Sequence, residues 1–209
     1  MDQRDPVTSE GSSYVWRFIW KCVLLLIVCI GGFWMTKQVD ADRKAKRAEF
    51  LQREEAASQR FPPCANPPEF ETFLEPEAPP VGIHSLHIRN DDSFYNLIVK
   101  VRDYTTDRAV ASFFIPPHLS IADETFPDGS YYLQYGFGGK LDISCKNFLT
   151  PIWVIQLSMK ELRENTQDGH KNWERLEYNF TSALSSGGRR YRSSQQYYHW
   201  VSAEDFRKP

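Results

Sequence analysis

The segment YNLIVKVRDYTTDRAVASFFI, residues 95–115, indicates two β-strands joined by a polar turn. The alternate positions 97, 99 and 101 are apolar, whereas Lys100 and Arg102 lie on the other face together with Ile98. Because successive side chains of a strand point to opposite faces, this pattern predicts a strand with one buried and one solvated face. The polar stretch TTDRA, residues 105–109, then leads into the second strand, AVASFFI.

The same period of two continues toward the C-terminus. PDG, residues 127–129, is a turn in which proline presets one backbone angle and glycine supplies a positive one, and SYYLQYGF follows it as a strand. Further strand candidates are HSLHIR, LSIADETF, LDISCKNF, IWVIQLSM, WERLEYNF and SQQYYHWVS. IWVIQLSM is apolar on both faces, which favours a central strand. Short, regularly spaced strands predict an all-β domain over residues 81–209, an antiparallel β-sandwich or a small barrel.

These strands carry a resemblance to known proteins. NLIVKVRDYTTDRAVASFFIPP, residues 96–117, followed by PDGSYYLQYGFG, residues 127–138, resembles small β-domains of uncharacterised bacterial single-span membrane proteins. More distantly, the segment is similar to prealbumin-like and carboxypeptidase-regulatory-like β-sandwiches. One departure is Asp107, which stands where a turn glycine is more usual. The resemblance implies a sandwich on a membrane anchor and no catalytic residues.

An uncharged run from Cys22 to Met35 predicts a transmembrane helix over residues 14–36. At 1.5 Å per residue such a helix crosses a hydrocarbon core of about 30 Å. Arg17 and Lys21 lie in its first turns, where long cationic side chains reach the headgroups, and tryptophans occur at both ends, as in interfacial belts. A cleaved signal peptide is the weaker interpretation, because the run ends in bulky residues rather than small ones.

The segments around the anchor differ in composition. Residues 1–13 form a polar tail, and residues 37–60 are rich in Ala, Glu, Lys and Arg without Gly or Pro, which predicts a charged helical stalk. Phe50 and Leu51 stand among charges there and form no heptad seam, so the stalk is expected to be solvated. Residues 61–80 contain seven prolines and are expected to be an extended linker, partly packed along the domain edge.

Composition excludes some classes of function. The 25 basic and 27 acidic residues give a formal net charge of −2, which does not favour nucleic acid as a partner. His84 and His87 are three residues apart on a predicted strand and therefore face opposite sides, so no metal site is expected. Phosphate-binding glycine loops, dinucleotide fingerprints and nucleophile elbows are missing from the sequence, so we predict no cofactor and no catalytic residue.

One loop is the best candidate for an interaction patch. SSGGRRYRSSQQYYHW, residues 185–200, places a flexible Gly and Ser segment beside three arginines and an aromatic cluster. The predicted patch consists of Arg189, Arg190, Arg192, Tyr197, Tyr198 and Trp200. The plain alternative is a hairpin loop that leads into the last strand, because Gly and Ser are ordinary hairpin residues and an arginine pair is usually solvated.

Two signals disagree about the side of the membrane on which the domain lies. Basic residues near the span number three on its N-terminal side and six on its C-terminal side, which places the domain in the cytoplasm by the positive-inside rule. Against this, Cys64 and Cys145 are the two cysteines outside the span, and such a pair suits one disulfide in an oxidising compartment. We predict export with a Cys64–Cys145 bridge; the alternative is two free thiols in a reducing compartment.

Together these features predict a membrane-anchored β-sandwich interaction module of a cell-envelope assembly, with a periplasmic C-terminal domain and an unidentified protein partner. An enzyme with an unrecognised site is the first alternative. A carbohydrate- or ligand-sensing module is the second. A deep pocket with convergent polar groups and perturbed acid or base residues would favour the enzyme, whereas an exposed aromatic patch would favour the binding module.

Overall fold

The computed structural model describes residues 11–68, 72–75, 82–163, 165–167, 170–172, 174–182 and 198–208. The chain divides into two compact units, Met1–Ala45 and Lys46–Pro209. The first unit contains most of one long helix. The second contains the end of that helix and all of the β-structure.

Helix α1 (Gly11–Arg60) is continuous over 50 residues. It begins before the apolar segment and runs through the predicted stalk, which has no Gly or Pro to interrupt it. In the apolar segment, side chains such as Leu25, Val28 and Trp34 are exposed. Among the described residues, α1 is the one helix that is long and apolar enough to cross a membrane by length and composition. This agrees with the sequence-based prediction of an apolar N-terminal helix.

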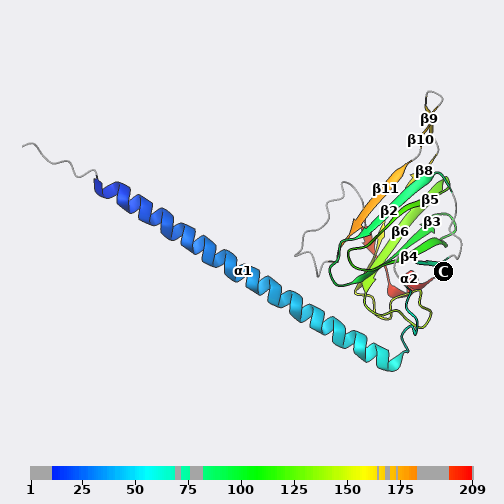
Figure 1. The fold of residues 1–209 in the computed structure, drawn as a ribbon, viewed down its shortest axis with the longest axis horizontal. Coiled ribbons are helices and arrows are strands. Elements are labelled where there is room, and N and C mark those ends of the chain that lie inside the picture. The colour runs from blue at the N-terminus through cyan, green and yellow to red at the C-terminus, as the bar shows by residue number, and fades with distance from the viewer. Residues whose placement is uncertain are drawn as a thin grey trace, which may run out of the picture. The chain divides into compact units, whose positions relative to one another are not determined.

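The β-structure consists mainly of two largely antiparallel sheets (Figure 1). The large sheet has the strand order β1 (Thr72–Glu75), β4 (Ala109–Ile115), β3 (Asn96–Asp103), β6 (Gly129–Gly138), β7 (Trp153–Leu157) and β12 (Tyr198–Trp200), and β8 (Lys160–Leu162) also pairs with β6. The smaller sheet has the order β11 (Arg175–Phe180), β2 (His84–Asn90) and β5 (Ser120–Phe126). The strands β9 (Asn165–Gln167) and β10 (His170–Asn172) pair with each other as a separate antiparallel hairpin. Only β11 and β2 pair in parallel among the described strands, and neither sheet closes into a barrel there.

One apolar core lies between the two sheets. The large sheet contributes residues such as Leu97, Val99 and Phe113, and the smaller sheet contributes Ile88 and Ile121. The positions that the sequence assigned to the apolar face of β3 all belong to this core. Apolar burial of this kind is the main free-energy gain of folding, so the alternating pattern determines which face of β3 turns inward.

The other face of the large sheet is buried as well, which corrects the predicted solvated face of β3. Lys100 and Arg102 are only 2% and 1% exposed. Helix α2 (Ala203–Arg207) covers this face with Phe206, which packs in a second apolar cluster together with Ile98 and Phe148. The strand pattern could not reveal this cover, because both α2 and the loop that contains Phe148 lie far from β3 in the sequence.

Two of the strand predictions differ in their outcome. The segment LDISCKNF is a turn-rich loop instead of a strand, with the Cys145 amide bonded to the Asp142 carbonyl at 2.9 Å. Cys145 has φ 60°, a left-handed conformation that no regular strand contains. β7 is an interior strand of the large sheet, paired with β6 on one side and β12 on the other, as its apolar faces predicted.

The turn between β3 and β4 explains an unusual residue. Asp107 has φ 57°, so it adopts the left-handed conformation that would favour glycine at this position. Asp103 stabilises the same turn by accepting hydrogen bonds from the Thr105 and Thr106 amides at 3.0 and 2.7 Å. The bond from the Thr106 amide is the main cause that lowers the pKa of Asp103. Aspartate tolerates the left-handed region better than most residues, which accounts for its use here.

The end of α1 is part of the β-domain, whereas the sequence predicted a solvated stalk over these residues. Phe50 is 3% exposed, belongs to the main core and meets Tyr95 edge to face at 5.3 Å between ring centroids. The guanidinium of Arg47 lies 3.9 Å from the centroid of the Phe94 ring. The buried carboxylate of Glu54 accepts hydrogen bonds from the backbone amides that follow β6. The last turns of α1 are therefore anchored to the domain by packing and by hydrogen bonds.

Part of the predicted linker also joins the domain. Residues 72–75 form β1, which pairs with β4 at the edge of the large sheet. Pro63 makes an isolated β-bridge with Asp142 in the loop after β6. The compact unit accordingly begins at Lys46 and not at the predicted start of the β-domain, residue 81.

We expect Gly139→Ala to lower the free energy of unfolding by about 1–3 kcal/mol, the cost of leaving buried polar groups without partners. A Cβ atom at position 139 would lie 2.5 Å from Oε2 of Glu54, so the carboxylate would have to leave the amides of Gly139 and Lys140. Urea unfolding of a double-mutant cycle with Glu54→Ala checks this. In the Glu54→Ala background the Gly139→Ala substitution should cost much less, and strictly additive effects would contradict the contact.

Candidate functional site

The two cysteines outside the predicted span form a disulfide bond in the structure. The Cα atoms of Cys64 and Cys145 are 5.1 Å apart, and the sequence separation of the two residues is 81. The Cys64 amide also donates a hydrogen bond to the Leu141 carbonyl at 3.0 Å. This is the pairing that the sequence predicted, and it fastens the chain just after α1 to the loop that covers the outer face of the large sheet.

Most of the predicted interaction patch falls outside the described residues, namely Arg189, Arg190, Arg192 and Tyr197. The other two members, Tyr198 and Trp200, belong to the edge strand β12. Trp200 is 66% exposed and packs edge to face against Trp153, with ring centroids 6.0 Å apart. The basic part of the patch thus stays a prediction.

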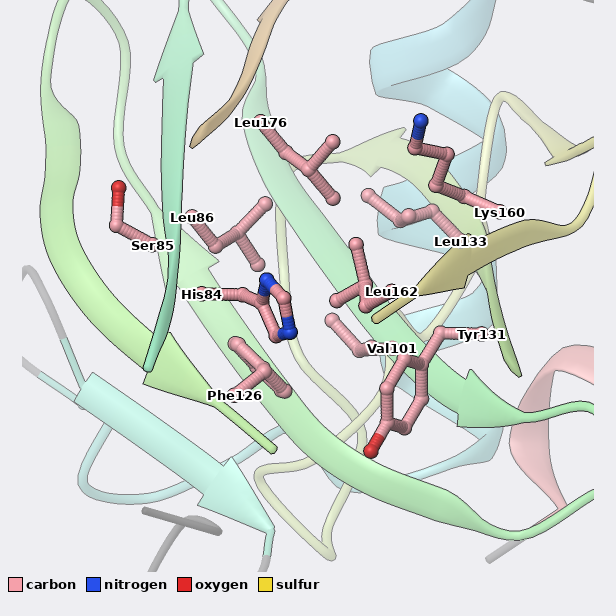
Figure 2. A pocket seen from close by; sticks show the side chains of 10 residues that line it. All are labelled: His84, Ser85, Leu86, Val101, Phe126, Tyr131, Leu133, Lys160, Leu162 and Leu176. Carbon is pink, nitrogen blue, oxygen red and sulfur yellow. The ribbon is translucent and has the colours of Figure 1, made fainter. Parts of the chain in front are cut away.

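A small enclosed cavity lies between the sheets, at His84 (Figure 2). Its volume is about 10 Å³, room for about one water molecule, and its walls are mostly leucine, valine and aromatic side chains. His84 is 1% exposed, and its Nε2 lies 2.8 Å from Oδ1 of Asp128, while its Nδ1 accepts a hydrogen bond from the Glu174 amide at 3.1 Å. These bonds indicate a neutral ring that donates from Nε2 to Asp128.

The His84–Asp128 pair has the composition of a catalytic dyad but lacks the surroundings of one. Figure 2 shows that the neighbouring Ser85 points to the other side of β2, away from the imidazole. The cavity is also too small for a substrate. We interpret His84 as a core histidine with satisfied hydrogen bonds. Within the described residues, no group of three or more His, Cys, Asp or Glu side chains gathers to hold a metal ion.

The candidate site is an open groove of about 500 Å³ on the outer side of the large sheet. Its lining comes from the β3–β4 turn, the strands β6, β7 and β12, and the segment around α2. The lining residues are Tyr104, Asp107, Tyr132, Gln134, Gln156, His199, Trp200, Val201, Ser202, Asp205 and Lys208. Polar side chains dominate this surface, and Tyr104 is its exposed aromatic side chain, 59% exposed. Trp200 is the register partner of Ile155, so its ring lies on the core-facing side of the sheet, against Trp153.

A row of polar residues crosses four adjacent strands beside this groove. Lys100 of β3 is the register partner of Gln134 of β6, Gln134 pairs with Gln156 of β7, and Gln156 pairs with His199 of β12. Directly opposed residues share one face of a sheet, so the row lies on the outer face. Gln134 donates from Nε2 to Oε1 of Gln156 at 2.9 Å, which fixes two of these side chains relative to each other.

Arg102 supports the floor of the groove from below. Its Nε donates to Oε1 of Gln134 at 2.9 Å, and its other nitrogens donate to the backbone carbonyls of Asp107 and Lys208. A guanidinium that is 1% exposed needs such partners, because an unsatisfied buried charge is very unfavourable. Arg102 therefore connects the β3–β4 turn, the floor and the segment after α2, and holds the groove in one geometry.

Two hydrogen-bonded pairs complete the walls. The hydroxyl of Tyr132 donates to Oδ1 of Asp107, and burial, followed by this bond, raises the pKa of the Tyr132 phenol far above its ordinary value. Asp205 accepts from Nζ of Lys208 and from the hydroxyl of Ser202, both at 2.6 Å. The Lys208 bond is the main cause that lowers the pKa of Asp205, and the Asp205 bond is the main cause that raises the pKa of Lys208. At neutral pH the Tyr132 phenol and the Lys208 ammonium therefore stay protonated, and the Asp205 carboxylate stays ionised.

Sequence analysis missed the groove, and the ring of Trp200, the one fully described member of the predicted patch, lies on the opposite face of the sheet. One feature of the sequence could have indicated the groove. Several strands carry a polar residue on the face opposite their apolar residues, as with Arg102, Gln134 and Gln156. Such positions normally face water, so they predicted solvated strand faces. Only the strand order and register bring them into one row.

Comparisons with known proteins give no family assignment. No family model matches the chain, and neither a curated protein nor a solved structure matches it significantly. The resemblance to prealbumin-like and carboxypeptidase-regulatory-like domains accordingly stays a prediction. The function of the groove has to be inferred from its own geometry.

Proposed function

We propose that this chain is a membrane-anchored β-sandwich binding module, held by α1 in the inner membrane of a bacterial cell, whose groove binds another component of the envelope. The observation that carries the proposal is the open groove, in which the exposed aromatic side chain of Tyr104 lies beside a floor of hydrogen-bonded polar side chains. Exposed aromatic surface beside organised polar groups is characteristic of binding sites.

Binding is favoured over catalysis by the chemistry of the walls. A general acid or base needs a pKa near the working pH, and environments that serve catalysis shift pKa values toward neutrality. In the groove the pKa values shift away from neutrality instead. The pKa values of Tyr132 and Lys208 are raised and that of Asp205 is lowered, so Tyr132 and Lys208 stay protonated and Asp205 stays ionised. These pairs are suited to holding a fixed surface rather than to exchanging protons with a substrate.

We infer that the domain lies outside the cytoplasm. The Cys64–Cys145 bond is of the kind that persists in oxidising compartments such as the bacterial periplasm. The six basic residues that follow the span argue for the opposite side, but long domains translocate largely regardless of such charges. The disulfide is the stronger argument, since a reducing compartment would leave both thiols free.

Labelling of a single new cysteine tests the topology. We expect Met159→Cys, placed in a background with Cys22 and Cys29 replaced by serine, to react with a membrane-impermeant maleimide in intact spheroplasts, because position 159 is exposed on the β-domain. Cys64 and Cys145 should react only after reduction and denaturation. Labelling of position 159 only after lysis, with Cys64 and Cys145 both reactive without reductant, would place the domain in the cytoplasm.

Photo-cross-linking in living cells tests the binding function. A photo-reactive amino acid at Tyr104, on the wall of the groove, is expected to give a discrete adduct of higher mass. The matched control is the same group at Ile143, which is 72% exposed and lies outside the groove lining. Adducts from neither position, or equal adducts from both, would contradict a binding function of the groove.

A further inference from the structure

We propose that His84 is an acid-sensitive switch, which holds the start of strand β11 at neutral pH and releases it when the imidazole takes up a second proton. The inference goes beyond the proposed binding function and does not depend on the groove. Three segments meet at the ring. His84 begins β2, Asp128 lies in the turn between β5 and β6, and Glu174 directly precedes β11.

The switch depends on different roles for the two ring nitrogens. Nε2 of His84 lies 2.8 Å from Oδ1 of Asp128, and a carboxylate only accepts, so Nε2 carries the proton. Nδ1 accepts a hydrogen bond from the backbone amide of Glu174 at 3.1 Å. A neutral imidazole has one donor and one acceptor and therefore satisfies both neighbours. An imidazolium has two donors and leaves the Glu174 amide without an acceptor.

Protonation of His84 would keep the bond to Asp128 and break the bond to Glu174. A hydrogen bond between an imidazolium and a carboxylate is charge-assisted and is stronger than its neutral counterpart. At Nδ1, by contrast, two N–H groups would face each other. The cavity beside the ring has a volume of only about 10 Å³ and mostly apolar walls, so the ring has little room to turn away (Figure 2). The backbone at Glu174 is therefore the part that moves.

The other described contacts of Glu174 are too weak to hold the start of β11 alone. Its carbonyl accepts from the Ser85 amide at 3.0 Å. Its carboxylate pairs with Nζ of Lys160 at 2.7 Å, but both side chains are more than a third exposed, and exposed ion pairs contribute little stability. Within the described sheet β11 pairs on one side only, with β2. Phe180 is buried and holds the far end of β11, so the release is local.

The ionisable groups that face the ring make Asp128 the one to vary. Its carboxylate contacts the ring directly and attracts an imidazolium. Lys160 of β8 lines the same cavity and opposes a second positive charge, although its ammonium is paired with the carboxylate of Glu174. The Tyr131 phenol of β6 also lines the cavity and stays neutral, because burial raises its pKa. The lining from β3 and β5 is apolar.

The test measures amide hydrogen exchange of the full-length protein in detergent at about pH 7.5 and about pH 5, since histidine ordinarily titrates within this range. Dividing the exchange rates of an unfolded chain at the same pH by the measured rates gives the protection of each peptide. We expect the protection of the peptide that contains Glu174 and Leu176 to fall by about tenfold or more at the lower pH, because a buried hydrogen bond is lost there. Peptides from β3 and β6 should keep their protection.

Three variants identify the group that responds. His84→Asn keeps a carbonyl oxygen for the Glu174 amide but cannot be protonated, so the response to pH should disappear. Asp128→Asn removes a charge at a position that is 56% exposed and should move the midpoint of the release to lower pH by about half a unit or more. The matched control is His87→Gln, on the other face of β2, which should respond like the wild type.

Each outcome decides for or against the switch. The proposal is overturned if the folded wild type keeps the protection of the Glu174 peptide at both pH values, or if a folded His84→Asn variant still responds to pH. Should His84→Asn fail to fold, Asp128→Asn decides, and an unchanged midpoint overturns the proposal. A simultaneous loss of protection in β3, β6 and β11 would also overturn it, because this would be global unfolding by acid instead of local release.

Discussion

Replacement of both Cys64 and Cys145 by serine is expected to lower the free energy of unfolding of the β-domain by about 4 kcal/mol. The bond closes a loop with a sequence separation of 81 residues, and a cross-link over a long loop removes many conformations from the unfolded chain. A loss of this size is a large part of the total stability of a typical domain.

Urea unfolding of the oxidised protein, the reduced protein and the double serine variant measures this effect. Reduced wild type and the double variant should agree with each other. The control is the variant with Cys22 and Cys29 replaced by serine, since both are free thiols in α1 and should contribute nothing to the unfolding of the β-domain. A midpoint that does not change on reduction would mean that the bond adds no stability and would weaken the argument for export.

Phe50→Ala is expected to destabilise the domain by about 3–5 kcal/mol, the usual cost of removing a buried phenylalanine. The ring is 3% exposed, belongs to the core shared by the two sheets and contacts Tyr95. Its loss would leave a cavity where α1 packs on the domain, and the neighbouring bonds of Glu54 would weaken with it. The final turns of α1 should then separate from the β-structure before the rest of the domain unfolds.

The adjacent Leu51 provides the matched control for Phe50. Leu51 is 50% exposed, so Leu51→Ala removes an apolar side chain from the same helical turn and should change the stability by only about 0.5 kcal/mol. Urea unfolding and amide hydrogen exchange of the backbone around Glu54 measure both variants. Similar, small effects of the two substitutions would show that the end of α1 is the free stalk that its composition suggested.

Local pattern in the sequence was sufficient for several elements. The period of two correctly located β3, β4 and β6, because burial of one face imposes that period along a strand. Hydropathy alone identified the apolar part of α1, since a long uncharged run such as the one from Cys22 to Met35 has few other uses. The pairing of Cys64 with Cys145 followed from counting, because these are the two cysteines outside the apolar helix.

Other features depended on contacts between segments that are distant in the sequence. The charged composition around Phe50 predicted a solvated helix, and only the presence of Tyr95 and the shared core turns this one residue inward. The outer face of β3 looked solvated until α2, more than a hundred residues away, covered Lys100 with Phe206. A one-dimensional pattern records the polarity of a residue, but not which segment will be available to cover it.

The groove is the clearest case of what tertiary structure decided. Gln134 and Gln156 each appear in the sequence as an ordinary polar position of a strand. Strand order and register set them side by side, and the buried Arg102 fixes them by a hydrogen bond from beneath. The sequence by itself determined strands such as β3, β4 and β6, the apolar helix and the cysteine pair, because each depends on local periodicity, hydropathy or number. The groove required the fold, because the free energy of a polar side chain depends on partners that only strand pairing and the docking of α2 bring within hydrogen-bonding distance.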